Sequence, residues 1–281
     1  MTSILTNNGA MVALQTLQSI NNNLTDAQNH ISTGKTIGSA KDNSAVWAIS
    51  KVMESDVAGF NAVADSLALG EGTVDVALAG TEQISDILND IKEKIVQATG
   101  ENVDHTKIGN EITELGSQIT QIISASQFNG ANLLSGTTVD GTNTQLTVLS
   151  SLDRNPGGSG VTAANITVAA LDFTTNLDIA TDIDVSSATA TNTSLTNIET
   201  MIQFVVDSGA TLGAAASRID DQQEFVSKLS NAMKAGIGAL VDTDMEEASA
   251  RLKALQTQQQ LGVQALSIAN SAPSTLQQLF R

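Results

Sequence analysis

The stretch LQTLQSINNNLTDAQNHI, residues 14–31, carries the repeat that decides the fold. Its apolar side chains recur at steps of three and four residues, which places them along one face of a helix. A helix with one apolar face buries that face against another element, so this helix needs a partner. The apolar face consists of Leu14, Leu17, Ile20, Leu24, Ala27 and Ile31.

A second helix of the same character is predicted at the other end of the chain. Thr243-Asp244-Met245-Glu246 has the spacing of a capping box, which would begin the helix. No charged side chain occurs in residues 1–25 or 254–280. We therefore expect the two ends either to pair within one chain or to bundle with the ends of other copies. The apolar stripe of the second helix is Leu252, Leu255, Leu261, Ala265, Ile268, Ala272 and Leu276.

The rest of the chain predicts helices that flank a β-like centre. Helical periodicity covers about 44–98, 105–126 and 195–235, with an interruption at Gly236 and Gly238. Alternating apolar residues at 166–170 and 177–185 indicate strands in hairpins, and residues 155–160 indicate a loop. We predict a mainly α fold: an elongated antiparallel helical rod with terminal coiled-coil helices and a small β-hairpin region. Its expected divisions are 1–43, 44–130, 131–196, 197–240 and 241–281.

The composition excludes several classes of protein. Thirty acidic and thirteen basic residues make the formal charge −17, so we expect no nucleic-acid partner and no attraction to an anionic membrane. Cysteine is absent, and no run of 18 apolar residues exists. The first residues also lack the basic start and apolar run of a secretory signal. We expect a protein that either stays in the cytoplasm or is secreted without a cleaved signal peptide.

The segment HISTGKT, residues 30–36, ends like a phosphate-binding P-loop. That motif needs a glycine five residues before Gly34, where Asn29 stands, and a strand before the loop. A helical repeat precedes Gly34 instead. We therefore expect Gly34 to end a helix in a left-handed conformation, with Lys35 near the negative end of the helix dipole. A nucleotide-binding enzyme remains the weaker alternative.

Other candidate sites are weak. His30 and His105 are isolated, and no pattern for a serine nucleophile occurs. Asp178, Asp182 and Asp184 lack the glycine and the closing glutamate of a calcium loop, so a solvated strand face is favoured. We expect no catalytic, cofactor or metal site. Asn23, Asn165 and Asn192 begin N-glycosylation sequons, and O-linked sugars on 135–196 stay an open possibility.

Several segments, in order along the chain, resemble bacterial flagellin. Residues 34–50 read GKTIGSAKDNSAVWAIS and resemble the turn and helix start of that family, with Ser-Ala-Lys-Asp at its centre. Residues 126–136, SQFNGANLLSG, are similar to its Phe-Asn-Gly…Leu-Leu-x-Gly segment. Leu212-Gly213-Ala214 with Arg218-Ile219, and the tail with Ala269-Asn270, Pro273 and terminal Arg281, also resemble family segments.

The resemblance implies an extracellular, non-enzymatic subunit of the flagellar filament. Such a subunit would be exported unfolded through the flagellar type III channel and would polymerise with itself. Cap proteins, hook-associated proteins and an export chaperone would be its other partners. A hook–filament junction protein of the same superfamily is the alternative. The residues expected at subunit contacts are Leu14, Leu17, Ile20, Leu24, Ile31, Lys41, Asp42, Leu261, Leu266, Ile268, Leu276 and Leu279.

The chain also departs from the family pattern. Thr36 stands where an arginine is usual, and Val46 where a small residue is usual. The segment similar to the family's innate-receptor patch reads Asp90-Ile91-Lys92-Glu93-Lys94, so we expect no recognition by that receptor. About 60 residues separate Gly136 from Leu195, which leaves room for little or no outer domain.

Overall fold

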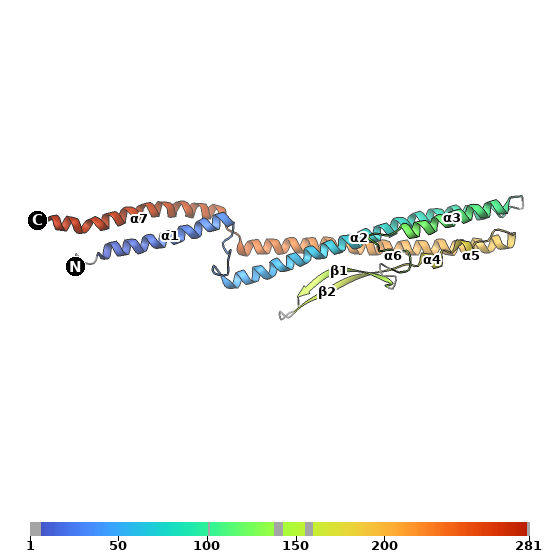
Figure 1. Cartoon of the computed structure of the whole chain (residues 1–281), viewed down its shortest axis with the longest axis horizontal. Helices are drawn as coiled ribbons and strands as arrows, with labels where there is room; N and C mark the ends of the chain where they lie inside the picture. Colours follow the sequence, from blue (N-terminus) through green and yellow to red (C-terminus); the bar gives the residue numbers. More distant parts are fainter. Residues whose placement is uncertain (1–6, 101, 138–142, 155–159, 280–281) are drawn as a thin grey trace. The chain divides into compact units, whose positions relative to one another are not determined.

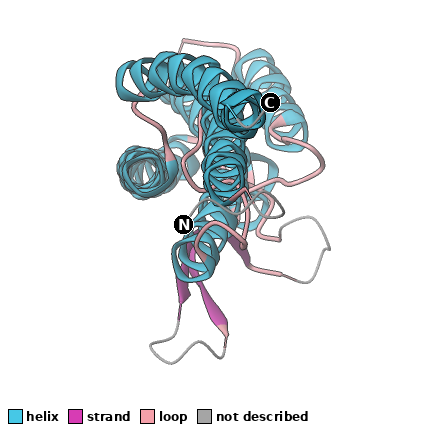
Figure 2. Ribbon diagram, turned by 90° about the vertical axis from the view of Figure 1, so that its left-hand side faces the viewer, coloured by secondary structure: helices cyan, strands magenta, loops and turns pink. Residues whose placement is uncertain are grey.

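The computed structural model describes residues 7–100, 102–137, 143–154 and 160–279, except the side chains of 188 and 272–279. Helices make up most of it, and a single hairpin contains the described strands (Figure 2). The helices are α1 (Asn8–Thr33), α2 (Ser44–Gln97), α3 (His105–Ala125), α4 (Phe173–Asn176), α5 (Ile179–Asp182), α6 (Ala188–Val241) and α7 (Met245–Leu279). The strands are β1 (Gln145–Arg154) and β2 (Val161–Ala169). The predicted mainly helical fold with a central hairpin is confirmed.

The chain divides into two compact units. Unit 1 comprises residues 1–55 and 232–281, and its main feature is the antiparallel pair of α1 and α7 (Figure 1). Asn7 begins α1 by accepting a hydrogen bond from the backbone N–H of Ala10, at 3.1 Å. Gly34 ends α1 with a φ of 70°, and its N–H bonds to the carbonyl of His30. The predicted left-handed glycine cap is therefore confirmed.

Unit 2 comprises residues 56–231 and holds the larger core. Within it α2 and α6 run antiparallel (Figure 1). Lys92 of α2 forms an ion pair with Glu199 of α6. Further along, a Cβ placed on Gly209 would lie 3.6 Å from Cγ2 of Thr81. The helix α3 adds one buried face, Ile112, Ile119 and Ile123. The fully buried side chains between these helices include Leu67, Ile84, Leu88, Ile91, Ile95, Ile198, Leu212 and Ile219.

The hairpin of β1 and β2 packs on α2. Its strands are antiparallel, with a bulge between Leu149 and Ser151. The approach is close because α2 has glycine there: a Cβ on Gly70 would lie 2.5 Å from Cγ2 of Val148. Arg154 at the end of β1 forms an ion pair with Asp56. The predicted alternation at 166–170 is confirmed, since Ile166 and Val168 of β2 are buried.

Three local predictions are wrong. Residues 177–185 are not a strand, because Asp172 and Asp178 accept backbone hydrogen bonds from Thr175 and Thr181 and so begin the short helices α4 and α5. The helix α6 continues through Gly236 and Gly238 to Val241. The cap of α7 is Asp244, whose Oδ1 accepts from the N–H groups of Glu246 and Glu247. The predicted loop at 155–160 lies outside the described residues, apart from Gly160.

Candidate assembly surface

The helix α1 turns one narrow face toward α7. The residues of this face that are not exposed follow strict steps of three and four, which is a heptad pattern. The sequence predicts Leu14 on this face, but Ala13 lies there instead and Leu14 is exposed. We call this face the α1 seam: Ala10, Ala13, Leu17, Ile20, Leu24, Ala27 and Ile31.

The helix α7 has a matching face. Steps of four and three again connect the residues that are not exposed, over the part of α7 whose side chains are described. The predicted stripe follows this face only as far as Leu255. Beyond that residue the prediction is wrong, because Gln259 and Gly262 face α1 while Leu261, Ala265 and Ile268 are exposed. We call the face the α7 seam: Ala248, Leu252, Leu255, Gln259, Gly262, Leu266 and Ala269.

Three contacts fix how the two seams meet. A Cβ placed on Gly262 would lie 3.1 Å from Cδ1 of Leu17, so the leucine fills the space above the glycine. The side chain of Asn21 accepts a hydrogen bond from Nε2 of Gln259 at 2.7 Å. Nearer the chain ends, Nδ2 of Asn7 donates to the carbonyl of Ala269 at 2.8 Å. The pair is therefore antiparallel and in one defined register.

Both helices also carry apolar side chains that face away from the seams. Leu14 is 56% exposed, Leu261 58% and Ile268 70%. The set also includes Met11, Val12 and Val263. A helix pair that exposes several large apolar side chains among uncharged polar ones, as residues 7–25 and 254–271 do, has a surface suited to burial against other chains.

The predicted contact residues therefore separate into several groups. Leu17, Ile20, Leu24, Ile31 and Leu266 are half-buried in the seams of their own chain. Leu14, Leu261 and Ile268 lie on the exposed faces, whereas Lys41 and Asp42 are exposed in the segment that joins α1 to α2. The side chains of Leu276 and Leu279 lie outside the described residues. The prediction missed Ala13, Gln259 and Gly262, which a strict heptad count that admits small and polar residues would have found.

Backbone hydrogen bonds join the segment that follows α1 to the junction between α6 and α7. The N–H of Thr36 donates to the carbonyl of Val241 at 2.7 Å, and that of Thr243 donates to the carbonyl of Gly34 at 2.9 Å. The hydroxyls of Thr36 and Thr243 lie 3.0 Å apart. The residue that departs from the family's usual arginine therefore takes part in this junction.

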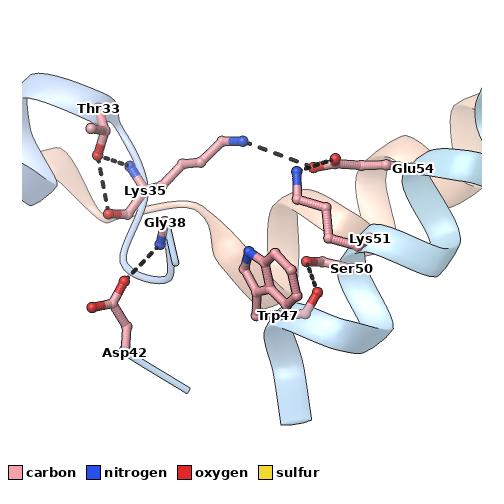
Figure 3. Close-up of polar contacts among 8 residues, drawn as sticks. All are labelled: Thr33, Lys35, Gly38, Asp42, Trp47, Ser50, Lys51 and Glu54. Carbon is pink, nitrogen blue, oxygen red and sulfur yellow. Dashed lines mark hydrogen bonds and ion pairs between the residues drawn. The ribbon is translucent and has the colours of Figure 1, made fainter. Parts of the chain in front are cut away.

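Asp42 holds together the turn of residues 38–42, which precedes α2 (Figure 3). Its Oδ2 accepts hydrogen bonds from the N–H groups of Gly38 and Ser39, at 3.1 and 2.9 Å, and from the hydroxyl of Ser39 at 3.1 Å. The backbone and then the side-chain hydrogen bonds from Ser39 lower the pKa of this carboxyl below its ordinary value of 3.8. In the isolated chain Asp42 is thus occupied with its own turn.

The segment around Lys35 does not have the geometry of a phosphate site. Helix α1 precedes Gly34, and the next helix begins only at Ser44. Figure 3 shows the Lys35 side chain extending toward Glu54, with Nζ 3.9 Å from the carboxylate. Lys51 approaches the same carboxylate at 2.6 Å. Lys35 thus pairs with α2, a partner that the sequence did not reveal.

Other kinds of site find little support among the described residues. No group of three or more His, Cys, Asp or Glu side chains there could hold a metal ion. Asp178 instead bonds to Thr181, and Asp184 accepts from the N–H of Ser186. No described helix is long and apolar enough to cross a membrane.

Comparisons with known proteins agree with these features. Residues 4–139 match the family described as the bacterial flagellin N-terminal helical region, and residues 195–280 match the bacterial flagellin C-terminal helical region. A flagellin of Brucella melitensis is 43% identical, and the alignment covers all of both chains. Flagellin FljM of Caulobacter vibrioides is 41% identical over 99% of this chain and 98% of its own.

One solved structure supports the same fold. A putative flagellar hook-associated protein from Vibrio parahaemolyticus aligns with a TM-score of 0.53 at 16% identity, covering 72% of this chain and 100% of its own. A flagellin from Bacillus cereus aligns with a TM-score of 0.47 at 22% identity, over 63% of this chain and 94% of its own. The first of these likenesses concerns the fold alone.

Proposed function

Because the chain belongs to the bacterial flagellin family and is a subunit of the extracellular flagellar filament, we propose that it polymerises through α1 and α7. In this proposal the two seams pair within one chain, and the outward apolar faces pack against neighbouring copies. Eight of the twelve contact residues predicted from the sequence then act at two levels, while Lys41, Asp42, Leu276 and Leu279 stay predicted contacts. Seam residues such as Leu17 build the pair, and outward residues such as Ile268 join pairs together.

The observation that carries this proposal is the combination of exposed apolar side chains with the absence of charge. Leu14, Leu261 and Ile268 are more than half exposed, and no charged residue occurs in 1–25 or 254–280. Fully burying one such side chain contributes roughly 1.5–3 kcal/mol. An unpaired charge would make the same burial unfavourable. Both properties favour a surface that other chains cover.

The remaining expectations extend the proposal. Export in an unfolded state fits terminal helices that bury little apolar surface within one chain, since such segments fold weakly alone. Cap proteins, hook-associated proteins and an export chaperone would then meet the chain before and during assembly. We also propose that the functional divisions lie at 43/44, 130/131, 196/197 and 240/241.

The sequence leaves a hook–filament junction protein as the alternative role. The likeness to the Vibrio parahaemolyticus structure concerns only the fold, whereas the flagellins of Brucella melitensis and Caulobacter vibrioides match over nearly their whole length. These full-length matches favour the filament. Long filaments grown from the purified chain alone would support that role, and short or capped assemblies would favour the junction.

Removal of either terminal helix tests the proposal. We expect a chain without residues 1–33, or without 254–281, to form no filaments while unit 2 keeps its helical signal and cooperative melting. Electron microscopy and circular dichroism are the measurements. As a matched control, a chain without residues 138–142, which lie outside both terminal helices, should still polymerise. Normal filaments from either terminal truncation would overturn the proposal.

A further inference from the structure

The heptad pattern of the α1 and α7 seams does not by itself determine their register, that is, which residues of the two helices stand level with each other. In most coiled coils, charged residues beside the seam select the partner and the register. Residues 1–25 and 254–280 contain no charge, so this device is absent there. The α1 seam has an apolar residue at all seven positions, and a slip of seven residues would again place apolar residues against α7. The backbone hydrogen bonds of Thr36 and Thr243 hold one end of the pair, and within the charge-free part the register depends on side-chain contacts along the seams.

The α7 seam contains one polar residue, Gln259, among its seven described members. Its Nε2 donates to Oδ1 of Asn21 at 2.7 Å, and it is half-buried between Leu255 and Gly262 along the seam. A polar residue at a seam position is satisfied only where its partner stands opposite, so it specifies register at a cost in stability.

A slip of α7 by seven residues along α1 in one direction separates Gln259 from Asn21. Counting from the contact of Leu17 with Gly262, the observed register places Gln259 level with Ile20 and beside Asn21. A slip of seven residues toward the start of α1 would bring Gln259 level with Ala13 and beside Leu14, which offers no hydrogen bond. The half-buried Gln259 side chain would then lie beside Leu14 without a protein partner, which loses one net hydrogen bond.

We propose that Gln259, through its hydrogen bond with Asn21, helps to set the register of α1 against α7 in the charge-free part of the pair, beside the fit of Leu17 on Gly262. This inference rests on the proposed role of the two helices in polymerisation. Correct register matters there because it decides which outward side chains stand next to each other. A slipped pair would present Leu14 and Leu261 to neighbouring copies in the wrong relative positions.

Disulfide trapping in filaments tests the inference, because the chain has no cysteine of its own. The double variant Ala10→Cys/Ala269→Cys reports the observed register, since these residues are level with each other on the two seams. The double variant Leu24→Cys/Ala248→Cys reports the slipped register described above. Intrachain and interchain disulfides separate by gel mobility, and single-cysteine variants identify the interchain products.

Each reporter is placed in two backgrounds, Gln259→Leu and Gln258→Leu. Gln258 is exposed, so its substitution is the matched control for the same change one residue away. In Gln259→Leu filaments we expect the ratio of slipped to in-register disulfide to rise about fivefold over the control. The net free energy of one hydrogen bond changes an equilibrium constant by about this factor. An equal ratio in the two backgrounds would overturn the inference, because the fit of Leu17 on Gly262 would then suffice.

A second variant covers the case in which Gln259→Leu does not assemble. Asn21→Ala removes the acceptor at an exposed position and leaves the seam volume unchanged. We expect it to raise the slipped product in the same direction, and an unchanged ratio would reject the inference. If the in-register reporter fails to form in filaments of the otherwise unchanged chain, then the proposed pairing of α1 with α7 is wrong. That result is distinct from a failure of Gln259 to set the register.

Discussion

At the scale of single residues, the same amino acid has opposite roles in different helices. Gly70 of α2 lies under the hairpin, where a Cβ would come within 2.5 and 2.9 Å of the two methyl carbons of Val148. Gly213 of α6 has no atom within 4 Å of the corresponding position. Both lie inside helices, where glycine is less favourable than alanine. The first glycine is required by packing, and the second is not.

We predict that Gly70→Ala destabilises unit 2 by about 1–3 kcal/mol, because the hairpin must move away from α2. The matched change Gly213→Ala should stabilise it by about 0.5–1 kcal/mol through helix propensity alone. Urea unfolding followed by circular dichroism measures both. Equal effects at the two positions would mean that the hairpin does not pack closely on α2.

Asp42 yields a prediction about pH. Hydrogen bonds from Ser39 lower its folded pKa below 3.8, so they favour the ionised carboxyl. Its contribution to stability is therefore complete above pH 3.8 and is lost as the pH falls through the lower folded pKa. A carboxyl-carbon NMR titration should give a midpoint below 3.8 for Asp42. Ser39→Ala removes the hydroxyl donor and should raise that midpoint, and an unchanged midpoint would show that the hydroxyl bond does not contribute.

At the scale of elements, the helix pair in unit 1 differs from the pair in unit 2. The seams of α1 and α7 contain alanine and glycine at many positions, and most of their side chains are only half-buried. The pair of α2 and α6 instead has many fully buried isoleucine and leucine side chains. Burial of apolar surface is the main favourable term in folding. Unit 1 therefore gains less stability than unit 2 from burial within one chain.

A charge in a seam should consequently block assembly. Leu17→Asp or Leu266→Asp places a carboxylate between α1 and α7 with no basic partner nearby, at a cost of several kcal/mol. We expect neither variant to form filaments under the electron microscope, while unit 2 melts as before. Asn29→Asp adds the same charge at an exposed position outside the charge-free segment and should polymerise. Normal filaments from Leu17→Asp would show that the seam is not buried.

At the scale of the whole molecule, charge and assembly surface are segregated along the sequence. Every charged residue except Arg281 lies between Asp26 and Lys253, and the sum over the chain is −17. Like charges on neighbouring subunits repel over about 10 Å at 0.1 M salt. In the proposed assembly the neutral ends join, and acidic parts of neighbouring chains come together.

Added salt should accordingly accelerate polymerisation. We predict that raising NaCl from about 10 to about 150 mM, which shortens the screening length from about 30 to about 8 Å, increases the growth rate measured by light scattering. Sucrose at matched osmolality controls for excluded-solute effects. A rate that falls with NaCl would indicate that attraction between charged groups, rather than apolar contact between neutral ends, drives assembly.

Much of this protein follows from local sequence alone. The steps of three and four residues located α1, α2 and α3 because helix periodicity depends on side chains within a few turns. Gly34 was identified as a helix end for the same reason, since a left-handed residue after a helical repeat is a local requirement. The charge-free ends and the resemblance to flagellin likewise needed no coordinates.

Tertiary structure decided which of two apolar faces on each terminal helix meets its partner. Leu14 and Ala13 both continue the α1 repeat, and only the approach of α7 selects Ala13 for the seam. Gln259 and Gly262 appear unsuited to a seam until Asn21 and Leu17 stand opposite them. Asp178 begins a helix rather than continuing a strand, because its carboxylate accepts a hydrogen bond from the N–H of Thr181. Such choices depend on residues distant in sequence or on competing hydrogen bonds, neither of which periodicity records.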